Sequence, residues 1–184
     1  ELERKLKEAE IKPKVVIPVH FAGQSCDMMK IKEFSKKYNF TIIEDASHAT
    51  GAGYLDTKVG SCKYSDMTVF SFHPVKIVTT GEGGMVLTNN KDLYDKLILY
   101  RSHGITRNQD LMKNIADGFW YYEQIDLGFN YRMTDIQAAL GFSQIQRLDD
   151  FVAKRRYLAN RYNELLAALP IKLPVESKNT NSSW

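Results

Sequence analysis

The sequence is poor in the features that mark disulfide-bonded, zinc-binding or membrane proteins. It has two cysteines in 184 residues, Cys26 and Cys62, and their separation matches no zinc-ligand spacing, so we expect reduced thiols in a cytoplasmic protein. No apolar run approaches the roughly 20 residues that a membrane-spanning helix needs. The charged residues 1–14 lack the apolar core of a signal peptide. These absences predict a protein with no membrane partner.

The sequence also has no strong charge of one sign. Its 25 basic and 22 acidic side chains give a net charge of +3, and the basic residues are scattered, which argues against a nucleic-acid partner. A mildly positive site would still suit a phosphorylated substrate. The four histidines lie at no metal-ligand spacing, and His20 and His103 are most simply structural. A hydrophobic content of 43% is typical of a globular domain with a real core.

Four short apolar runs predict the strands of a buried sheet. They lie at 15–19, 40–43, 67–72 and 85–88. Apolar residues recur at helical spacing between Met28 and Tyr38, after Asp27 as a suitable N-cap. Strand, helix and strand at this spacing predict a βαβ unit with parallel strands. The glycine turn at 81–84 predicts that the fourth strand reverses direction, so we expect a mixed sheet.

The second half of the sequence predicts helices and an ordered loop region. A helix should span 93–100, followed by a loop region over 104–132 that is rich in glycine, asparagine and aromatic residues. A long helix should begin after the N-cap Thr134 and end before Pro170. The expected parts of the chain are a large sheet domain, a long interdomain helix and the start of a small domain, at 1–133, 134–169 and 170–184.

Polar residues follow the predicted strands, where α/β sheets bind ligands. Asp45 follows the second strand, and Lys76 follows the third. A lysine amine and a carboxylate are what pyridoxal phosphate (PLP) chemistry needs, the first to form a Schiff base and the second to keep the ring nitrogen protonated. Taken singly, an aspartate at a strand end is more often a cap, and a loop lysine is usually solvated. Residues 81–84 lack the pattern of a nucleotide-triphosphate loop.

Five motifs occur in a fixed order along the chain. They are EDASHA at 44–49, FSFHPVK at 70–76, TGEGG at 80–84, RSHG at 101–104 and GFNYRMT at 128–134. Together they resemble the DegT/DnrJ/StrS aminotransferases, fold-type I PLP enzymes that aminate nucleotide-linked keto-sugars. The resemblance covers nearly the whole chain and implies an α/β fold with a mixed, seven-stranded type of sheet, here incomplete.

Two further segments, VHFAG at 19–23 and WYYEQ at 120–124, are similar to one branch of that family. This branch makes the precursor of pseudaminic acid by aminating a UDP-linked 4-keto-6-deoxy-N-acetylhexosamine. The resemblance therefore implies a nucleotide-sugar substrate and a role in surface-glycan biosynthesis. Lipopolysaccharide, capsule and flagellar glycans all remain open. Glutamate, the usual amino donor of the family, is the implied donor.

The resemblance also implies a role for five residues. Lys76 carries the Schiff base, and Asp45 pairs with the pyridine nitrogen. His48 lies near the cofactor ring and its phenolic oxygen, and Ser71 hydrogen-bonds the PLP phosphate. Asn130 resembles the residue that reaches the phosphate bound to the neighbouring subunit, which implies a homodimer with shared active sites.

Two alternatives to an active aminotransferase remain. Chains of this family are longer, so the resemblance implies that a phosphate-binding loop and most of the small domain lie outside the sequence. A non-catalytic fragment that keeps the sheet is therefore the first alternative. The second is a PLP-dependent sugar dehydratase. The dehydratases of the family replace the lysine with histidine, so Lys76 favours transamination.

Overall fold

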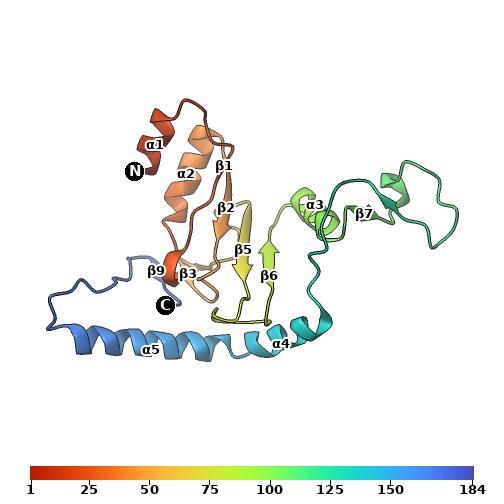
Figure 1. Cartoon of the computed structure of the whole chain (residues 1–184). Helices are drawn as coiled ribbons and strands as arrows, with labels where there is room; N and C mark the ends of the chain where they lie inside the picture. The colour runs from red at the N-terminus through yellow and green to blue at the C-terminus, as the bar shows by residue number, and fades with distance from the viewer. The chain divides into compact units, whose positions relative to one another are not determined.

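The computed structural model describes the whole chain, residues 1–184, and divides it into two units (Figure 1). The first unit consists of residues 1–87 and 135–184, and the second of residues 88–134. Each unit is described by itself below.

The main sheet of the first unit has four strands. In spatial order they are β1 (Val15–Val16), β2 (Thr41–Asp45), β5 (Met67–Ser71) and β6 (Gly84–Leu87). The first three are parallel, and β6 pairs antiparallel with β5. Helix α2 (Met28–Tyr38) connects β1 to β2. The predicted βαβ unit and the mixed sheet are therefore confirmed.

Strand β1 is shorter than expected. The run at 15–19 was predicted to be one strand, but β1 ends at Val16, and only Val19 pairs again, in an isolated bridge with Asp45. Pro18 lies in the gap, where it has no N–H to donate to a sheet ladder. Its carbonyl oxygen instead accepts a hydrogen bond from the Asp45 N–H at 2.9 Å.

The hydrophobic core lies between the sheet and the first two helices. Helix α1 (Leu2–Glu8) contributes Leu6, and α2 contributes Met28. The remaining buried members of this cluster are Phe40, Ile42 and Tyr54. Tyr54 also donates from its hydroxyl to the Asp27 carboxylate at 2.7 Å, which ties the N-terminus of α2 to the small sheet described next.

A small antiparallel sheet joins two distant parts of the first unit. Its strands are β4 (Thr57–Lys58), β3 (Gly53–Tyr54) and β9 (Thr180–Asn181), in that order. Because β9 pairs with β3, the last residues of the chain lie against the loop that follows β2.

The long helix expected over 134–169 is two helices, α4 (Asp135–Ile145) and α5 (Leu148–Leu166). Arg147 separates them with φ −106° and ψ 9°, outside the helical range. The helical spacing of apolar residues continues across this position, so the sequence pattern gave no sign of the break. None of the helices combines the length and the apolar character that crossing a membrane requires. The interdomain role of this region stays a prediction.

The second unit contains helix α3 (Lys91–Arg101) and little other regular structure. Asn90 caps α3 by accepting from the N–H groups of Asp92 and Leu93. The short strands β7 (Ile105–Thr106) and β8 (Glu123–Gln124) pair antiparallel, and one 3-10 turn, η2 (Gln109–Leu111), lies between them. The expected helix and the largely irregular loop region are both present.

The segment after α5 is held to the first unit by Arg156. Its guanidinium pairs with the Glu176 carboxylate at 2.7 and 2.9 Å and also donates to Asn181 Oδ1 and Ser182 O. The Gln24 amide oxygen accepts from Thr180 Oγ1 at 3.3 Å, and from the Ser177 N–H. These bonds close the chain back onto the sheet.

We expect Arg156→Met to release residues 170–184 from the unit. The substitution keeps much of the side-chain volume but removes bonds to a charged partner, so unfolding free energy in urea should fall by about 1–2 kcal/mol. Trypsin should cleave faster after Lys178, an exposed residue of this segment. Arg161→Met, at an exposed position of α5, is the matched control. Equal cleavage rates in both variants would contradict this account.

Candidate active site

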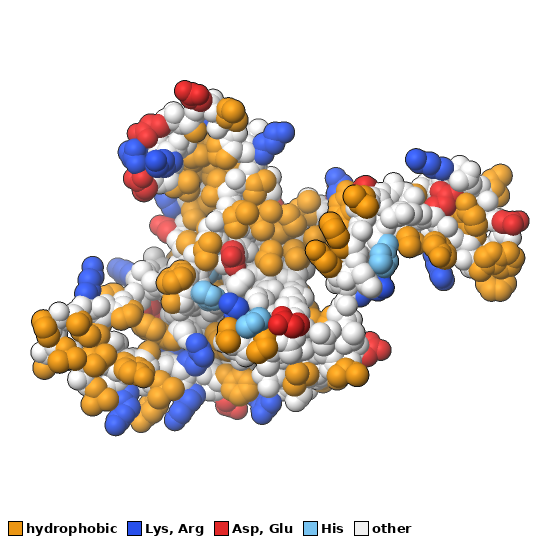
Figure 2. All heavy atoms as spheres, viewed as in Figure 1, with side chains coloured by type: hydrophobic (Ala, Val, Ile, Leu, Met, Phe, Trp, Pro, Cys, Tyr) orange, Lys and Arg blue, Asp and Glu red, His pale blue; other side chains and the backbone are white.

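Two parallel neighbouring strands, β2 and β5, end at the same edge of the main sheet. Their register pairs Asp45 with Val69, two residues before Ser71 at the end of β5. Side chains after these strands therefore start close together, as the sequence predicted. Figure 2 shows two histidine side chains with a basic side chain between them at this end of the strands.

The Asp45 carboxylate is ionised and lies within the electrostatic reach of Lys76. Hydrogen bonds from Ser47, including one from its N–H at 3.0 Å, lower the pKa of Asp45 most. Burial acts in the opposite direction, and the charges of His48 and Lys76 lower the pKa further. The acid and the amine that the sequence singled out are therefore close enough for the lysine charge to act on the acid.

Lys76 lies on a loop between β5 and β6 that is closed by backbone hydrogen bonds. The Phe72 N–H donates to Gly83 O at 2.8 Å, and the Thr80 N–H donates to Phe72 O at 3.0 Å. Lys76 itself closes a turn by donating its N–H to His73 O at 3.0 Å. Its half-buried side chain has no ion-pair or hydrogen-bond partner, so the amine is available to a ligand.

His48 is held by a strained turn in the segment after β1. The Ala22 N–H donates to His48 Nδ1 at 3.3 Å, so Nε2 of a neutral ring carries the proton. Ala22 has φ 54°, a left-handed conformation that non-glycine residues rarely adopt. The neighbouring Phe21 ring lies 5.7 Å from the His48 ring between centroids and is largely exposed.

The other two predicted residues lie in different units. Ser71 ends β5 in the first unit, where its hydroxyl oxygen accepts a long hydrogen bond, 3.4 Å, from the His73 N–H. Asn130 belongs to the second unit, where it forms an isolated antiparallel bridge with Ser102 and is exposed. Asp45, His48, Ser71 and Lys76 thus all belong to the first unit, and the charges of His48 and Lys76 act on Asp45.

Sequence reasoning missed a buried polar network directly behind this face. Its centre is Glu44, whose carboxylate accepts from His20 Nε2 at 2.7 Å and from Thr68 Oγ1 at 2.9 Å. The Ser65 hydroxyl donates to the same carboxylate. His20 and Thr68 are fully buried. The alternation of buried positions along β2 puts Glu44 on the face of Ile42, and that signal could have identified it.

Both members of the His20–Glu44 pair have shifted pKa values. Burial, the largest influence, raises the pKa of Glu44, but bonds from His20, Ser65 and Thr68 outweigh it and lower the pKa. Burial lowers the pKa of His20, but hydrogen bonds and charge from Cys26 and Glu44 raise it to about 9.

The protonation of His20 follows from its second hydrogen bond. The Cys26 N–H donates to Nδ1 at 3.1 Å, which requires a lone pair that the neutral ring has and the imidazolium lacks. This geometry therefore holds a neutral ring with its proton on Nε2, directed at Glu44, despite the raised pKa.

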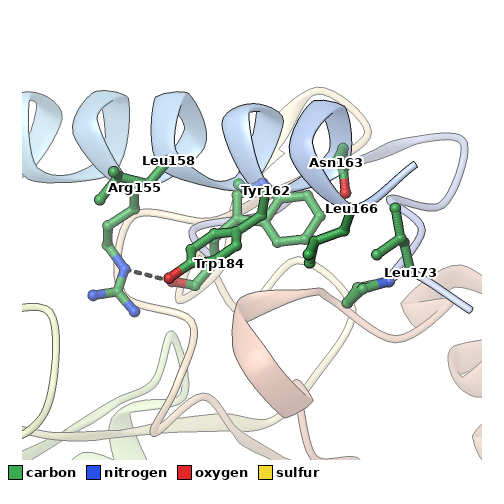
Figure 3. A pocket seen from close by; sticks show the side chains of 9 residues that line it. Arg155, Leu158, Tyr162, Asn163, Leu166, Leu173 and Trp184 are labelled. Carbon is green, nitrogen blue, oxygen red and sulfur yellow. Dashed lines mark hydrogen bonds between the residues drawn. The ribbon is translucent and has the colours of Figure 1, made fainter. Parts of the chain in front are cut away.

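A cavity lies elsewhere in the first unit. It has a volume of about 400 Å³ and lies beside α5, as Figure 3 shows. Its lining is mainly apolar and includes Leu158, Tyr162, Leu166, Leu173 and Trp184. None of these residues was predicted to act in chemistry, and the cavity contains no acid–amine pair.

Comparison with known proteins decides the family. All residues, 1–184, match the DegT/DnrJ/EryC1/StrS aminotransferase family. The chain belongs to this family. The resemblance seen in the five sequence motifs is thereby confirmed.

The names of relatives within the DegT/DnrJ/EryC1/StrS family contain different nucleotide sugars. UDP-4-amino-4,6-dideoxy-N-acetyl-beta-L-altrosamine transaminase of Campylobacter jejuni is 41% identical over 180 residues, 98% of this chain and 45% of that protein. GDP-perosamine synthase of Caulobacter vibrioides is 43% identical over 164 residues, 88% of this chain and 41% of that protein. The chain therefore spans less than half the length of these relatives.

A solved structure confirms the expected fold. Helicobacter pylori PseC, an aminotransferase involved in the biosynthesis of pseudoaminic acid, aligns with a TM-score of 0.81 and 31% identity. The alignment covers 96% of this chain and 45% of that chain. The chain thus has part of the α/β fold of PLP-dependent aminotransferases of fold type I.

The described residues fit pyridoxal 5′-phosphate, the cofactor of the DegT/DnrJ/EryC1/StrS family. An unpaired amine at Lys76 suits an aldehyde, and an ionised carboxylate at Asp45 suits a protonated ring nitrogen. A ring N–H on His48 suits a phenolic oxygen. These side chains offer the types of hydrogen-bond donor and acceptor that the groups of the cofactor need. The pairing of each residue with a particular group stays a prediction.

The stability of the first unit should depend on pH through Glu44. Its pKa is lower in the fold than the ordinary 4.5, so its stabilising effect is complete above about pH 4.5 and is lost as the pH falls through the folded value. Urea unfolding should show a smaller acid-induced loss in Glu44→Gln, whose amide does not titrate. Glu8→Gln, at an exposed position, should retain the wild-type dependence. Identical profiles for all three proteins would contradict this assignment.

Proposed function

We propose that the whole protein is a PLP-dependent aminotransferase that moves an amino group from glutamate to a nucleotide-linked keto-sugar. The single observation that carries this proposal is that Asp45 ends β2 and Lys76 lies in the loop after β5, the parallel neighbour of β2. When bound, pyridoxal phosphate supplies an aldehyde that takes up the amino group and a ring that accepts electrons. The chain supplies the groups that bind and orient it.

Lys76 would hold the cofactor through its amine, at the aldehyde group. When not engaged there, the amine would move a proton at the reacting carbon atom of the donor or of the sugar. Backbone hydrogen bonds close the loop at 72–83 that carries Lys76, which supports a fixed position for this amine.

Asp45 keeps the ring nitrogen protonated by its charge. Its carboxylate is already ionised, because Ser47 hydrogen-bonds it and lowers its pKa. His48 donates from Nε2 to the phenolic oxygen, and Ser71 donates its hydroxyl to the phosphate. Both roles follow the family pattern at matching positions.

Asn130 reaches the phosphate held by a neighbouring subunit, so the working protein is a homodimer with shared sites. Its side chain is exposed, as this role requires. The two unpaired thiols, Cys26 and Cys62, suit a reducing cytoplasm.

The substrate we favour is a UDP-linked 4-keto-6-deoxy-N-acetylhexosamine, used for a surface glycan. The names of the Campylobacter and Helicobacter relatives support this choice. A GDP-linked keto-sugar is the second candidate, because the GDP-perosamine synthase is similar to a comparable degree. Direct assay of amino transfer from labelled glutamate to each sugar separates the two, and it also separates transamination from dehydration.

Reduction with borohydride in the presence of pyridoxal phosphate should fix the cofactor to Lys76. We expect peptide mass spectrometry of the full-length protein to find the label there and to lose it in Lys76→Ala. Lys63→Ala, which removes an exposed lysine paired with Asp56, is the control and should keep the label. A label on any other lysine would end the proposal, and no label at all would favour a non-catalytic protein.

Asp45→Asn should leave the label on Lys76 but lower turnover. A neighbouring opposite charge shifts a pKa by about 1–3 units, so its loss should lower the protonated fraction of the ring and the rate by about 10- to 1000-fold. The rate of glutamate-dependent amino transfer measures this effect. Wild-type turnover in Asp45→Asn would contradict the role of the carboxylate.

A further inference from the structure

We propose that the buried His20–Glu44 pair is a positioning device that holds Asp45 and His48 in place for the cofactor. This inference rests on the proposed function, which assigns those two residues to the cofactor ring. Neither His20 nor Glu44 faces the site itself, since both are buried behind it. They act through the backbone of the residues that they hold.

The first link runs from the pair to Asp45. Asp45 follows Glu44 in β2, so the two side chains point to opposite faces of the sheet. The backbone of Asp45 is held on both sides by the segment that leads to His20: its N–H donates to Pro18 O at 2.9 Å, and its carbonyl accepts from the His20 N–H at 3.0 Å. The side chain of His20 then returns to Glu44, which closes a ring of bonds around Asp45.

The second link runs from the pair to His48. The turn η1 (Phe21–Gly23) begins directly after His20, and its Ala22 N–H fixes the His48 ring. The Cys26 N–H bond to His20 Nδ1 holds the other end of this turn. A shift of His20 would therefore move the donor that fixes the His48 tautomer.

The C-terminal segment completes the support of this turn. Ser183 is fully buried, donates its N–H to Gly23 O at 3.1 Å and its hydroxyl to His48 O at 3.3 Å. A Cβ atom on Gly23 would lie 2.7 Å from Ser183 Oγ, so only glycine fits there. These contacts hold the backbone of the turn in place at its end. The His20–Glu44 pair holds it at its start.

Stability alone gives a weak reason for such a pair. Well-packed hydrophobic residues in place of a buried charge and its hydrogen-bond partner are often neutral or stabilising, whereas removing one partner alone is costly. A test must therefore separate the position of the site residues from the stability of the fold.

The experiment measures cofactor binding in the full-length protein, with pyridoxal 5′-phosphate as the probe. Glu44→Leu should raise the dissociation constant for pyridoxal 5′-phosphate by about tenfold. Losing a residue that supports a metal ligand has an effect of this size on metal affinity. The pH midpoint of the visible absorption of the bound cofactor should shift by about one unit, because the charge of Asp45 is displaced. Glu44→Gln, which keeps an acceptor for His20 Nε2, should stay within about twofold of wild type.

Met28→Ala is the matched control, since Met28 is a buried core residue away from the site. It should lower the thermal midpoint without moving the absorption midpoint. Thr68→Val, which removes only one bond to Glu44, should give an intermediate shift if Glu44→Leu does not fold.

The outcomes are distinguishable. If wild type fails to label at Lys76, the proposed function is wrong. If wild type labels but the Glu44 and Thr68 variants match Met28→Ala in both cofactor measurements, the pair is only structural and this inference is overturned. A Glu44→Gln protein as impaired as Glu44→Leu would overturn it too, because charge and not position would then matter.

Discussion

The burial of one carboxylate, that of Glu44, constrains the whole first unit. A buried charge without partners costs several kcal/mol, so the fold must bring donors to it. The donors come from two separate parts of the chain, His20 from the segment after β1 and Ser65 and Thr68 from the start of β5 and the residues before it. Gathering them aligns the end of β2 with the turn after β1 and with β5. The residues proposed to meet the cofactor begin at these same places. The hydrogen bonds that stabilise the Glu44 carboxylate therefore also fix the segments that form the proposed site.

The sequence predicted those features that depend on local pattern. Short apolar runs and one helical spacing predicted the βαβ unit, and the parallel strands then predicted that Asp45 and Lys76 follow neighbouring strand ends. The length of β1, the break at Arg147 and the return of β9 to β3 depend on contacts between distant residues or on one backbone angle. The bond between His20 and Glu44 spans 24 positions, and no local spacing reveals it. His20 was predicted to be structural, and its buried bond to Glu44 was not foreseen.

Family membership does not by itself choose the substrate. The five motifs lie mostly at strand ends and in loops, where we propose that the cofactor binds. Relatives with UDP-linked and GDP-linked sugars in their names are 41% and 43% identical, so overall identity does not choose between them. The chain spans less than half of either protein, and groups that select the nucleotide need not lie within it.

The left-handed backbone at Ala22 has an evolutionary consequence. A residue with a Cβ atom adopts φ near 54° at a cost of about 1–2 kcal/mol, and branching at Cβ raises that cost. Glycine and asparagine tolerate the conformation, whereas valine and isoleucine strain it. Position 22 therefore has a narrow mutational repertoire, although its side chain does no chemistry. Branched side chains at position 22 should therefore be selected against, even though only the main chain of this residue bonds His48.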